Sequence, residues 1–131
     1  MKPAILVLLL LLLLLFSKVT CAQYDDWKEY KNFYSMVTTV LHPAEYDDLK
    51  LVKDSSIFLL QKAKAWEASK IPKEINNDAM KKALSELVSL CSELNNAVLQ
   101  KKTDEEISLL AIKVHNKFHS IHGRYMIKLK R

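Results

Sequence analysis

The chain has 131 residues, a net charge of +5, two cysteines and a single glycine. The mild positive charge gives no reason to expect a nucleic-acid partner, and one glycine is too few for a glycine-rich phosphate loop. No segment alternates polar and apolar residues as a strand does, and no Asn-Gly or Asp-Gly hairpin turn occurs, so the sequence predicts an all-α protein.

The first 22 residues are typical of a secretory signal peptide. Lys2 precedes an apolar, leucine-rich run over residues 5–16, and Thr20 and Ala22 are small residues suited to a cleavage site. The run is shorter than the roughly 20 apolar residues of a membrane span. We therefore expect cleavage after Ala22 and no membrane association of the mature chain. The alternative, lipid attachment at Cys21, is disfavoured because the residues before it match a lipoprotein signal poorly.

The expected mature chain, residues 23–131, is large enough for one domain with one modest core. Loss of Lys2 and Lys18 lowers its net charge to 18 − 15 = +3. Cys91 is then the only thiol, so no intramolecular disulfide forms. Small secreted domains of animals usually contain several disulfides. We therefore expect an exported protein of the periplasm or surface, in a Gram-negative bacterium.

The first predicted helix covers residues 25–41. Apolar side chains recur along it at helical spacing, at Trp27, Tyr30, Tyr34, Val37 and Leu41. Proline disfavours helical geometry at the residue before it, so Pro43 is expected to end the helix. His42 would then lie at the corner between the first and second helices.

Two further helices follow. The second begins within residues 43–48, ends before Pro72, and has a core face of Leu49, Val52, Ser56, Leu59, Leu60, Ala63 and Trp66. After a polar link over residues 73–78, the third helix directs inward Met80, Leu84, Leu87, Val88, Cys91, Leu94 and Val98. Cys91, at the centre of that stripe, is expected to be a buried and unreactive thiol.

The fourth helix has a specific start signal. Thr103 is followed three residues later by Glu106, which is the capping-box pattern, and an apolar run comes next. The helix continues towards Gly123. Four amphipathic helices with short connections predict an up-down-up-down four-helix bundle.

Three of the four histidines lie in this last helix, beside its apolar stripe. His115 and His119 are four residues apart and His119 and His122 three apart, so they are neighbours on the helix surface. Met126 lies on the same shoulder. Imidazoles suit zinc and copper, and a methionine favours copper. The pattern predicts a copper or zinc site at His115, His119 and His122, with Met126 as a further ligand.

His42 is an additional candidate ligand for the metal. In an up-down bundle it would lie level with the start of the fourth helix, whereas His115 is about eleven residues, or roughly 16 Å, into that helix. A site made of His42, His115 and His119 would therefore need a tilted first helix or a later start of the fourth. The local site on the last helix is the preferred prediction.

Residues 118–125 resemble the end of the last helix in the periplasmic four-helix cytochromes, the soluble b-type cytochromes and the cytochromes c-prime. In those families a last-helix histidine binds haem iron. The resemblance implies that His122 is an axial ligand, with His119 beside it. It also implies that haem is bound non-covalently, because Phe118 and Ile121 stand where the haem-attaching cysteines would be.

Two functions remain open from the sequence. The first is a non-catalytic exported bundle that binds copper, zinc or non-covalent haem through its last-helix histidines. The second is a cofactor-free interaction or adaptor module in which the histidines line a solvated surface. The sequence has no Ser-His-Asp order and no CxxC pair, so enzymatic activity is not expected.

Overall fold

The computed structural model describes residues 3–4, 7 and 27–126, and side chains only as far as Arg124. Most of the predicted signal peptide lies outside these residues, as do Asp25 and Asp26 of the first predicted helix. In the part of the chain that is described, no helix is both long and apolar enough to cross a membrane.

The described residues form helices and turns and contain no strand, which confirms the all-α prediction. The first helix consists of three consecutive parts: α2 (Lys28–Met36), the π-helix η1 (Val37–Leu41) and α3 (His42–Ala44). The second and third are α4 (Lys50–Ala68) and α5 (Asp78–Leu99), joined through the 3-10 turn η2 (Lys73–Ile75). The fourth is α6 (Asp104–Ile121), which continues as the π-helix η3 (His122–Met126).

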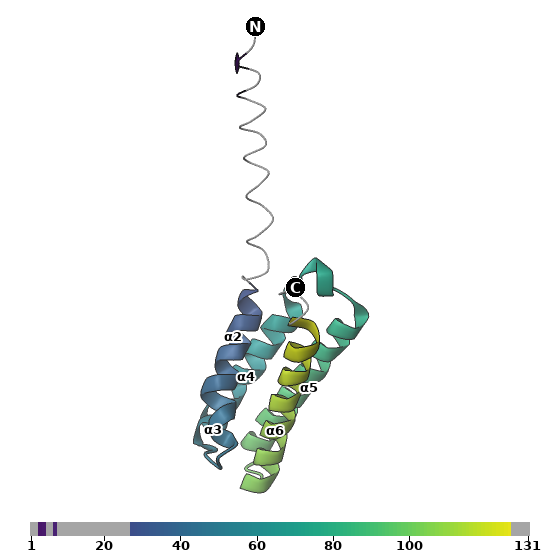
Figure 1. Ribbon diagram of the computed structural model, residues 1–131. Coiled ribbons are helices and arrows are strands. Elements are labelled where there is room, and N and C mark those ends of the chain that lie inside the picture. Colours follow the sequence, from purple (N-terminus) through teal and green to yellow (C-terminus); the bar gives the residue numbers. More distant parts are fainter. Residues whose placement is uncertain (1–2, 5–6, 8–26, 127–131) are drawn as a thin grey trace.

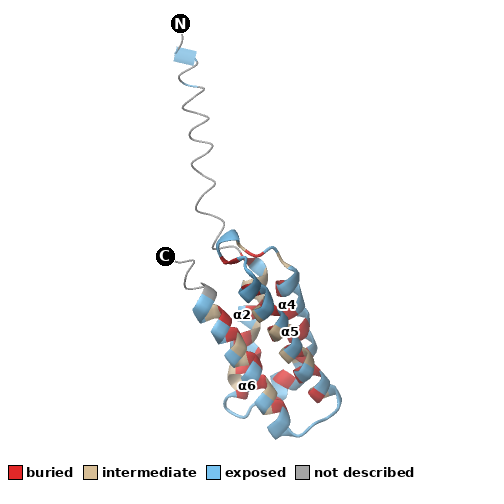
Figure 2. Cartoon of the chain, turned by 90° about the vertical axis from the view of Figure 1, so that its right-hand side faces the viewer, coloured by how far each residue is buried: buried red, intermediate tan, exposed pale blue. Residues whose placement is uncertain are grey.

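The four helices lie side by side (Figure 1). The most extensive contacts join α4 to α5 and α5 to α6, and α4 also packs on α2. The first helix meets α6 through η1 and α3, where the backbones approach, and through aromatic rings of α2, such as Phe33 on Phe118 at 5.7 Å. Buried residues lie on the sides of the helices that face one another, and exposed residues lie on the outer sides (Figure 2). The largest buried side chains include Phe33, Leu59, Trp66, Leu84 and Phe118.

Tyr34 differs from the prediction that it belongs to the core, because 45% of its surface is exposed. Its ring contacts those of Tyr30, Phe118 and His122, with centroid distances of 5.8–6.1 Å. Tyr34 therefore lies over the seam between α2 and α6. A tyrosine there buries one face of its ring while its hydroxyl stays in water.

Side chains cap two of the helices at their first turns. Thr103 and Glu106 form the predicted capping box, in which the Thr103 hydroxyl accepts from the Glu106 N–H and the Glu106 carboxylate accepts from the Thr103 N–H. The Asn77 side chain accepts a hydrogen bond of 2.8 Å from the N–H of Met80 at the start of α5. Each bond satisfies a backbone donor that the helix itself leaves unpaired.

Two helices end in left-handed residues that are not glycine. Asp47 has a φ of 64° and Lys101 a φ of 53°. The N–H of the residue after each one bonds back to a carbonyl five positions earlier, Asp48 to Pro43 and Lys102 to Ala97. These are Schellman motifs, where glycine is usually found because it has no Cβ to strain.

The prediction that Pro43 ends the first helix is wrong. His42 is helical, with φ −61° and ψ −43°, and the helix continues to Ala44. A proline in a regular α-helix clashes with the carbonyl four residues earlier and cannot donate to it. The π-helical turn before Pro43 relieves that conflict, because the bonding shifts to a five-residue step there: the His42 N–H reaches the Val37 carbonyl.

The π-helical turn also changes where His42 points. A π turn inserts one residue relative to the α-helical pattern, so the side chains after it are rotated about the axis by roughly the 100° that one residue contributes. His42 is therefore placed on the side of the first helix that faces α6, and α3 contacts α6 directly.

Candidate metal centre

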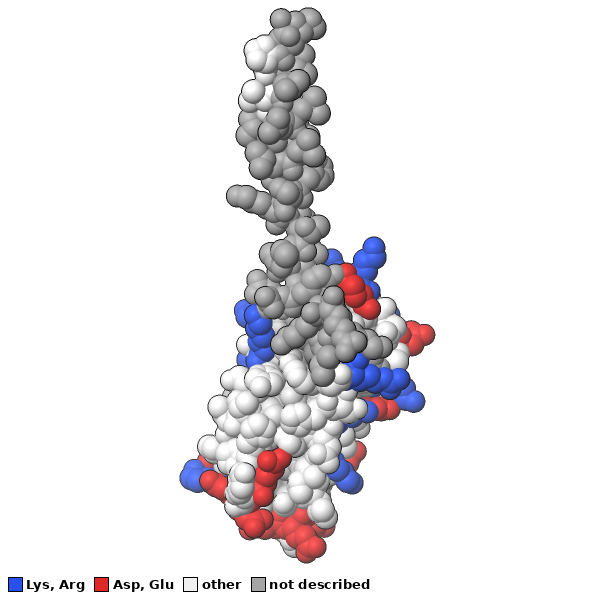
Figure 3. Space-filling view, in the orientation of Figure 1, with Lys and Arg blue, Asp and Glu red and all other residues white. Residues whose placement is uncertain are grey.

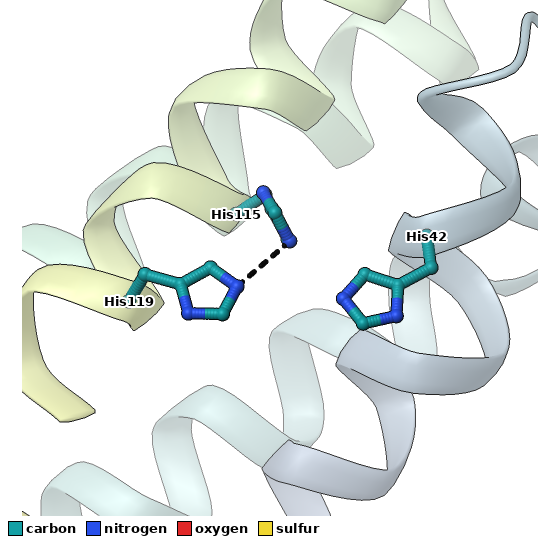
Figure 4. Close-up of side chains that lie close together, drawn as sticks. All are labelled: His42, His115 and His119. Carbon is teal, nitrogen blue, oxygen red and sulfur yellow. Dashed lines mark hydrogen bonds between the residues drawn. The ribbon is translucent and has the colours of Figure 1, made fainter. Parts of the chain in front are cut away.

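Three histidines from two helices meet on one side of the molecule: His42 from α3, and His115 and His119 from α6. One ring nitrogen of each lies within 4.8 Å of those of the other two. The ring centroids are 5.1 Å apart for His42 and His115, and 4.4 Å apart for His115 and His119. Figure 4 shows the three rings converging on the space between the two helices. We call this set the three-histidine centre.

The spacing of the nitrogens suits one small ion. The Nε2 atoms of His115 and His119 are 3.0 Å apart. Zinc binds imidazole nitrogen at about 2.0–2.1 Å, and tetrahedral ligands at that distance lie about 3.3–3.4 Å from each other. The pair on α6 therefore needs to separate only slightly, and His42 to approach slightly, for all three to bind the same ion.

Glu45 fixes the orientation of His115. Its Oε1 atom is 3.0 Å from Nδ1 of His115. With the carboxylate accepting from Nδ1–H, the proton of the neutral ring is on Nδ1, and the lone pair is on Nε2, which faces His119 and His42. A carboxylate behind a metal-binding histidine is a common outer partner, since it orients the ring and makes the ligand more basic.

Burial holds His115 in the form that binds metals. The pKa of His115 is lowered from its usual value, first because burial disfavours the charged ring and then because His119 and His42 are close. Glu45 opposes this shift. A lowered pKa keeps the imidazole neutral at neutral pH, and only a neutral imidazole donates a lone pair to a metal.

The centre is accessible from solvent on one side. His42 and His115 are half-buried, whereas His119 is exposed. Among the described residues, the group of potential ligands at this position contains three histidines and no fourth side chain. Three histidines with one free position is a known arrangement for zinc bound with a water molecule.

His122 lies apart from the three-histidine centre and contacts Tyr30 instead. The Nδ1 atom of His122 is 2.5 Å from the Tyr30 hydroxyl, and the two rings are stacked with centroids 5.9 Å apart. Phe118 stacks on the same histidine at 5.8 Å. The pKa of Tyr30 is raised to about 12, mainly by burial, so the phenol remains protonated.

The preferred sequence prediction therefore differs from the structure in its ligand set. It grouped His115, His119 and His122, and the structure groups His115 and His119 with His42. The estimated axial offset of roughly 16 Å assumed that the end of the first helix lies level with the start of the fourth, and it is wrong because the ring centroids of His42 and His115 are 5.1 Å apart. The helix runs past His42 to Ala44. Met126 is in η3, and its side chain lies outside the described residues.

Sequence reasoning missed Glu45 altogether. It follows Pro43 by two residues and was assigned to the start of the second helix, whereas α4 begins later, at Lys50. The spacing of His42 and Glu45 could have revealed its role. Two residues that are three positions apart in a helix lie on the same face, so Glu45 would be expected near the same partners as His42.

Acidic side chains gather near the end of the molecule that carries the centre. They lie in the turn after α3, at Asp47 and Asp48, and in the first turn of α6, at Asp104 and Glu105. Lys53 of α4 pairs with Asp104 at 2.6 Å, which brings the starts of α4 and α6 together. Figure 3 shows a broad uncharged area on the face that carries α2, α3 and α6, with acidic side chains below it.

Comparison with known proteins does not identify a relative. No family model matches the chain, and no match was found among curated proteins or among solved structures.

Proposed function

We propose that this protein is an exported up-down-up-down four-helix bundle that binds zinc or copper through His42, His115 and His119. The observation that supports it is the convergence of three imidazoles from two helices, with nitrogens within 4.8 Å of one another.

Three further features support metal binding. Glu45 orients His115, as an outer partner of a metal ligand does. Burial keeps His115 neutral. The acidic end of the molecule attracts cations towards the centre over distances of about a Debye length, roughly 8 Å in physiological salt.

The donor set favours Zn²⁺ or Cu²⁺ over Cu⁺, Mg²⁺ and Ca²⁺. Imidazole suits both, whereas Cu⁺ prefers sulfur and Mg²⁺ and Ca²⁺ prefer oxygen ligands. Cys91 is buried in α5 and is not in the group of potential ligands. Copper binds more tightly than zinc to a given nitrogen site, so the metal bound in the cell depends on which one is available.

Non-covalent haem is less well supported. A haem bound at Nε2 of His122 would have to fit beside the rings of Tyr30 and Phe118, which stack on that histidine with centroids 5.9 and 5.8 Å away. We therefore place the proposed ligand at the three-histidine centre.

Calorimetric titration of the mature chain with Zn²⁺ and Cu²⁺ tests the proposal. We expect one ion per chain, with a Kd below about 10 μM, which corresponds to roughly 7 kcal/mol of binding free energy. His42→Ala and His119→Ala should each weaken binding strongly. His122→Ala is the matched control, since it removes the same kind of side chain from the same helical segment, and it should bind as the parent does.

Two results would reject the proposed centre. Failure of the parent to bind either ion below 10 μM excludes metal binding and leaves the cofactor-free adaptor as the better explanation. If His122→Ala loses binding while His42→Ala binds as the parent does, the site consists of last-helix histidines alone.

A further inference from the structure

The three-histidine centre provides three ligands where Zn²⁺ takes four. The potential ligands that converge among the described residues are His42, His115 and His119 and no other side chain. Glu45 is engaged on the outer side of His115, at its Nδ1. The exposed position of His119 leaves water free to occupy the fourth place.

Water in that position becomes reactive. Zinc held by three neutral imidazoles and one water lowers the pKa of that water to roughly 7, so hydroxide is available at neutral pH. The same ion polarises a carbonyl oxygen that approaches it. An arrangement that fills only three positions thus differs in chemistry from a closed structural zinc site, in which all four ligands come from the protein.

We infer that the zinc-loaded three-histidine centre hydrolyses small uncharged esters with a good leaving group. This inference rests on the metal binding proposed above. His42, His115 and His119 would hold the zinc ion, and the ion would supply a hydroxide at neutral pH. That hydroxide would form the new bond to the ester carbonyl carbon, and the bond from this carbon to the leaving oxygen would break, with the electron pair going to the leaving group. The carboxylic acid formed would lose one proton to solvent, and the water that replaces the hydroxide would lose a second, so the sum is ester plus water to carboxylate, leaving-group anion and two protons.

The surroundings of the centre favour an uncharged substrate. Ile112 precedes His115 by three residues, so the two side chains are neighbours on α6, and 41% of the Ile112 side chain is exposed. Ile112 therefore offers apolar surface next to His115 on α6. The Glu45 carboxylate beside His115 disfavours a doubly charged phosphate monoester at the metal position.

The first experiment asks whether the fourth position is open. Co²⁺ replaces Zn²⁺ in such sites and has a visible spectrum that depends on its ligands. The Co²⁺-loaded chain is titrated with azide, an anion that displaces bound water. We expect the Co²⁺ spectrum to change as azide is added and to reach a plateau when the site is saturated with azide. A spectrum that azide leaves unchanged would show a filled fourth position and overturn the inference.

The second experiment measures hydrolysis of 4-nitrophenyl acetate by the Zn²⁺-loaded chain. We expect a rate at least tenfold above that of the metal-free chain and of free Zn²⁺ at equal concentration. His122→Ala should keep this rate and His119→Ala should lose it. 4-Nitrophenyl phosphate should not be hydrolysed measurably.

The outcomes separate this inference from the proposed function. Tight Zn²⁺ binding with no rate above free Zn²⁺ overturns the inference and leaves the metal-binding function in place. Failure to bind Zn²⁺ in the calorimetric titration overturns both. Hydrolysis that survives His119→Ala would show that another part of the chain is responsible, and would also overturn the inference.

Discussion

Glu45 has the clearest role at the scale of single residues, because it determines which nitrogen of His115 faces the metal position. Its carboxylate lies 3.0 Å from Nδ1 of His115. A glutamine can accept the same hydrogen bond through its carbonyl oxygen but has no charge. Glu45→Gln therefore tests the charge of the outer partner while keeping the size of the side chain.

We predict that Glu45→Gln weakens Zn²⁺ binding by about tenfold, the lower end of the range for outer partners of metal-binding histidines. Calorimetric titration of the variant measures this directly. Glu67→Gln is the control, because it makes the same change at an exposed position of α4. Equal affinities in the Glu45 and Glu67 variants would show that Glu45 does not act on the bound metal.

Cys91 supports a prediction about alkaline pH. Burial raises the pKa of its thiol to about 12, from 9.0 for an ordinary cysteine. Between these values the unfolded chain loses a proton that the folded chain keeps. Below pH 9 the Cys91 thiol therefore causes no loss of stability. Above pH 9 it should lower the free energy of unfolding by about 1.4 kcal/mol per pH unit.

Urea unfolding of the parent and of Cys91→Ala from pH 8 to pH 11 checks this. Tyr30, whose pKa is also raised, contributes to the alkaline loss in both proteins. The slope above pH 9 should therefore be shallower in Cys91→Ala, whatever its stability at pH 8. Parallel curves for the two proteins would mean that the Cys91 thiol is not protected by folding.

Lys101 shows how one residue affects the end of a helix. It closes α5 with a φ of 53°, a conformation that costs a residue with a Cβ roughly 1–2 kcal/mol. Glycine avoids this strain, though part of the gain is lost because glycine is more flexible in the unfolded chain. We predict that Lys101→Gly stabilises the protein by up to about 1 kcal/mol.

Thermal unfolding measures this change, with an expected rise in Tm of about 4–8 °C per kcal/mol for a domain of this size. Lys102→Gly is the control, because its φ is not positive and glycine brings only flexibility there. The explanation is incorrect if both variants lose stability to the same extent.

A buried polar pair joins α4 to α5. The hydroxyl of Ser56 donates to Oδ1 of Asn95 over 3.0 Å, and the two residues are only 3% and 6% exposed. Ser56→Ala leaves the amide oxygen of Asn95 without this partner in an apolar surrounding. We predict a loss of about 1–3 kcal/mol in the free energy of unfolding.

Urea unfolding of Ser56→Ala tests that loss. Ser55→Ala removes a hydroxyl one position earlier on the same helix, from a side chain that is not buried, and should change stability by less than about 0.5 kcal/mol. Similar losses in both variants would assign the effect to helix propensity rather than to the buried pair.

The helices themselves were predictable because their signals are local. The capping box of Thr103 and Glu106 and the apolar periodicity of α5 depend on residues a few positions apart, and the structure confirms both. The π-helical turn was not predictable in the same way. Pro43 cannot be part of a regular α-helix, so the helix either ends before it or continues through a π-helical turn. The rule that proline ends a helix considers only the first of these two outcomes.

The position of His42 in the three-histidine centre depends on that turn, so only part of this group of histidines was predictable. The spacing of His115 and His119 is local, and the pair was correctly identified as neighbours. The third ligand depends on the rotation and length of another helix, which the sequence does not state. Small errors in either quantity move His42 by several ångströms, so its position could not be derived from the sequence. His122 was preferred because it lies in the same helical segment as His115 and His119.

For the whole molecule, metal binding should raise thermal stability. An ion that binds only the folded chain stabilises it by RT ln(1 + [L]/Kd), about 2.7 kcal/mol at a hundredfold excess over Kd. We predict a rise in Tm of about 10 °C or more with Zn²⁺ at that excess. Scanning calorimetry with and without Zn²⁺ measures it, and His42→Ala should show little of the rise.

The position of His42 has a consequence for how the chain would respond to a metal. More than seventy residues separate His42 from His115, so an ion at the proposed centre would close a long loop between the first and last helices. In the unfolded chain only His115 and His119 are close in sequence, and bringing His42 to them costs loop entropy. The ion would thus act as a reversible cross-link that depends on the assembly of the helices. Strong chelation would remove that link while the helices remain, leaving the first helix as the part of the chain most readily released to a protease.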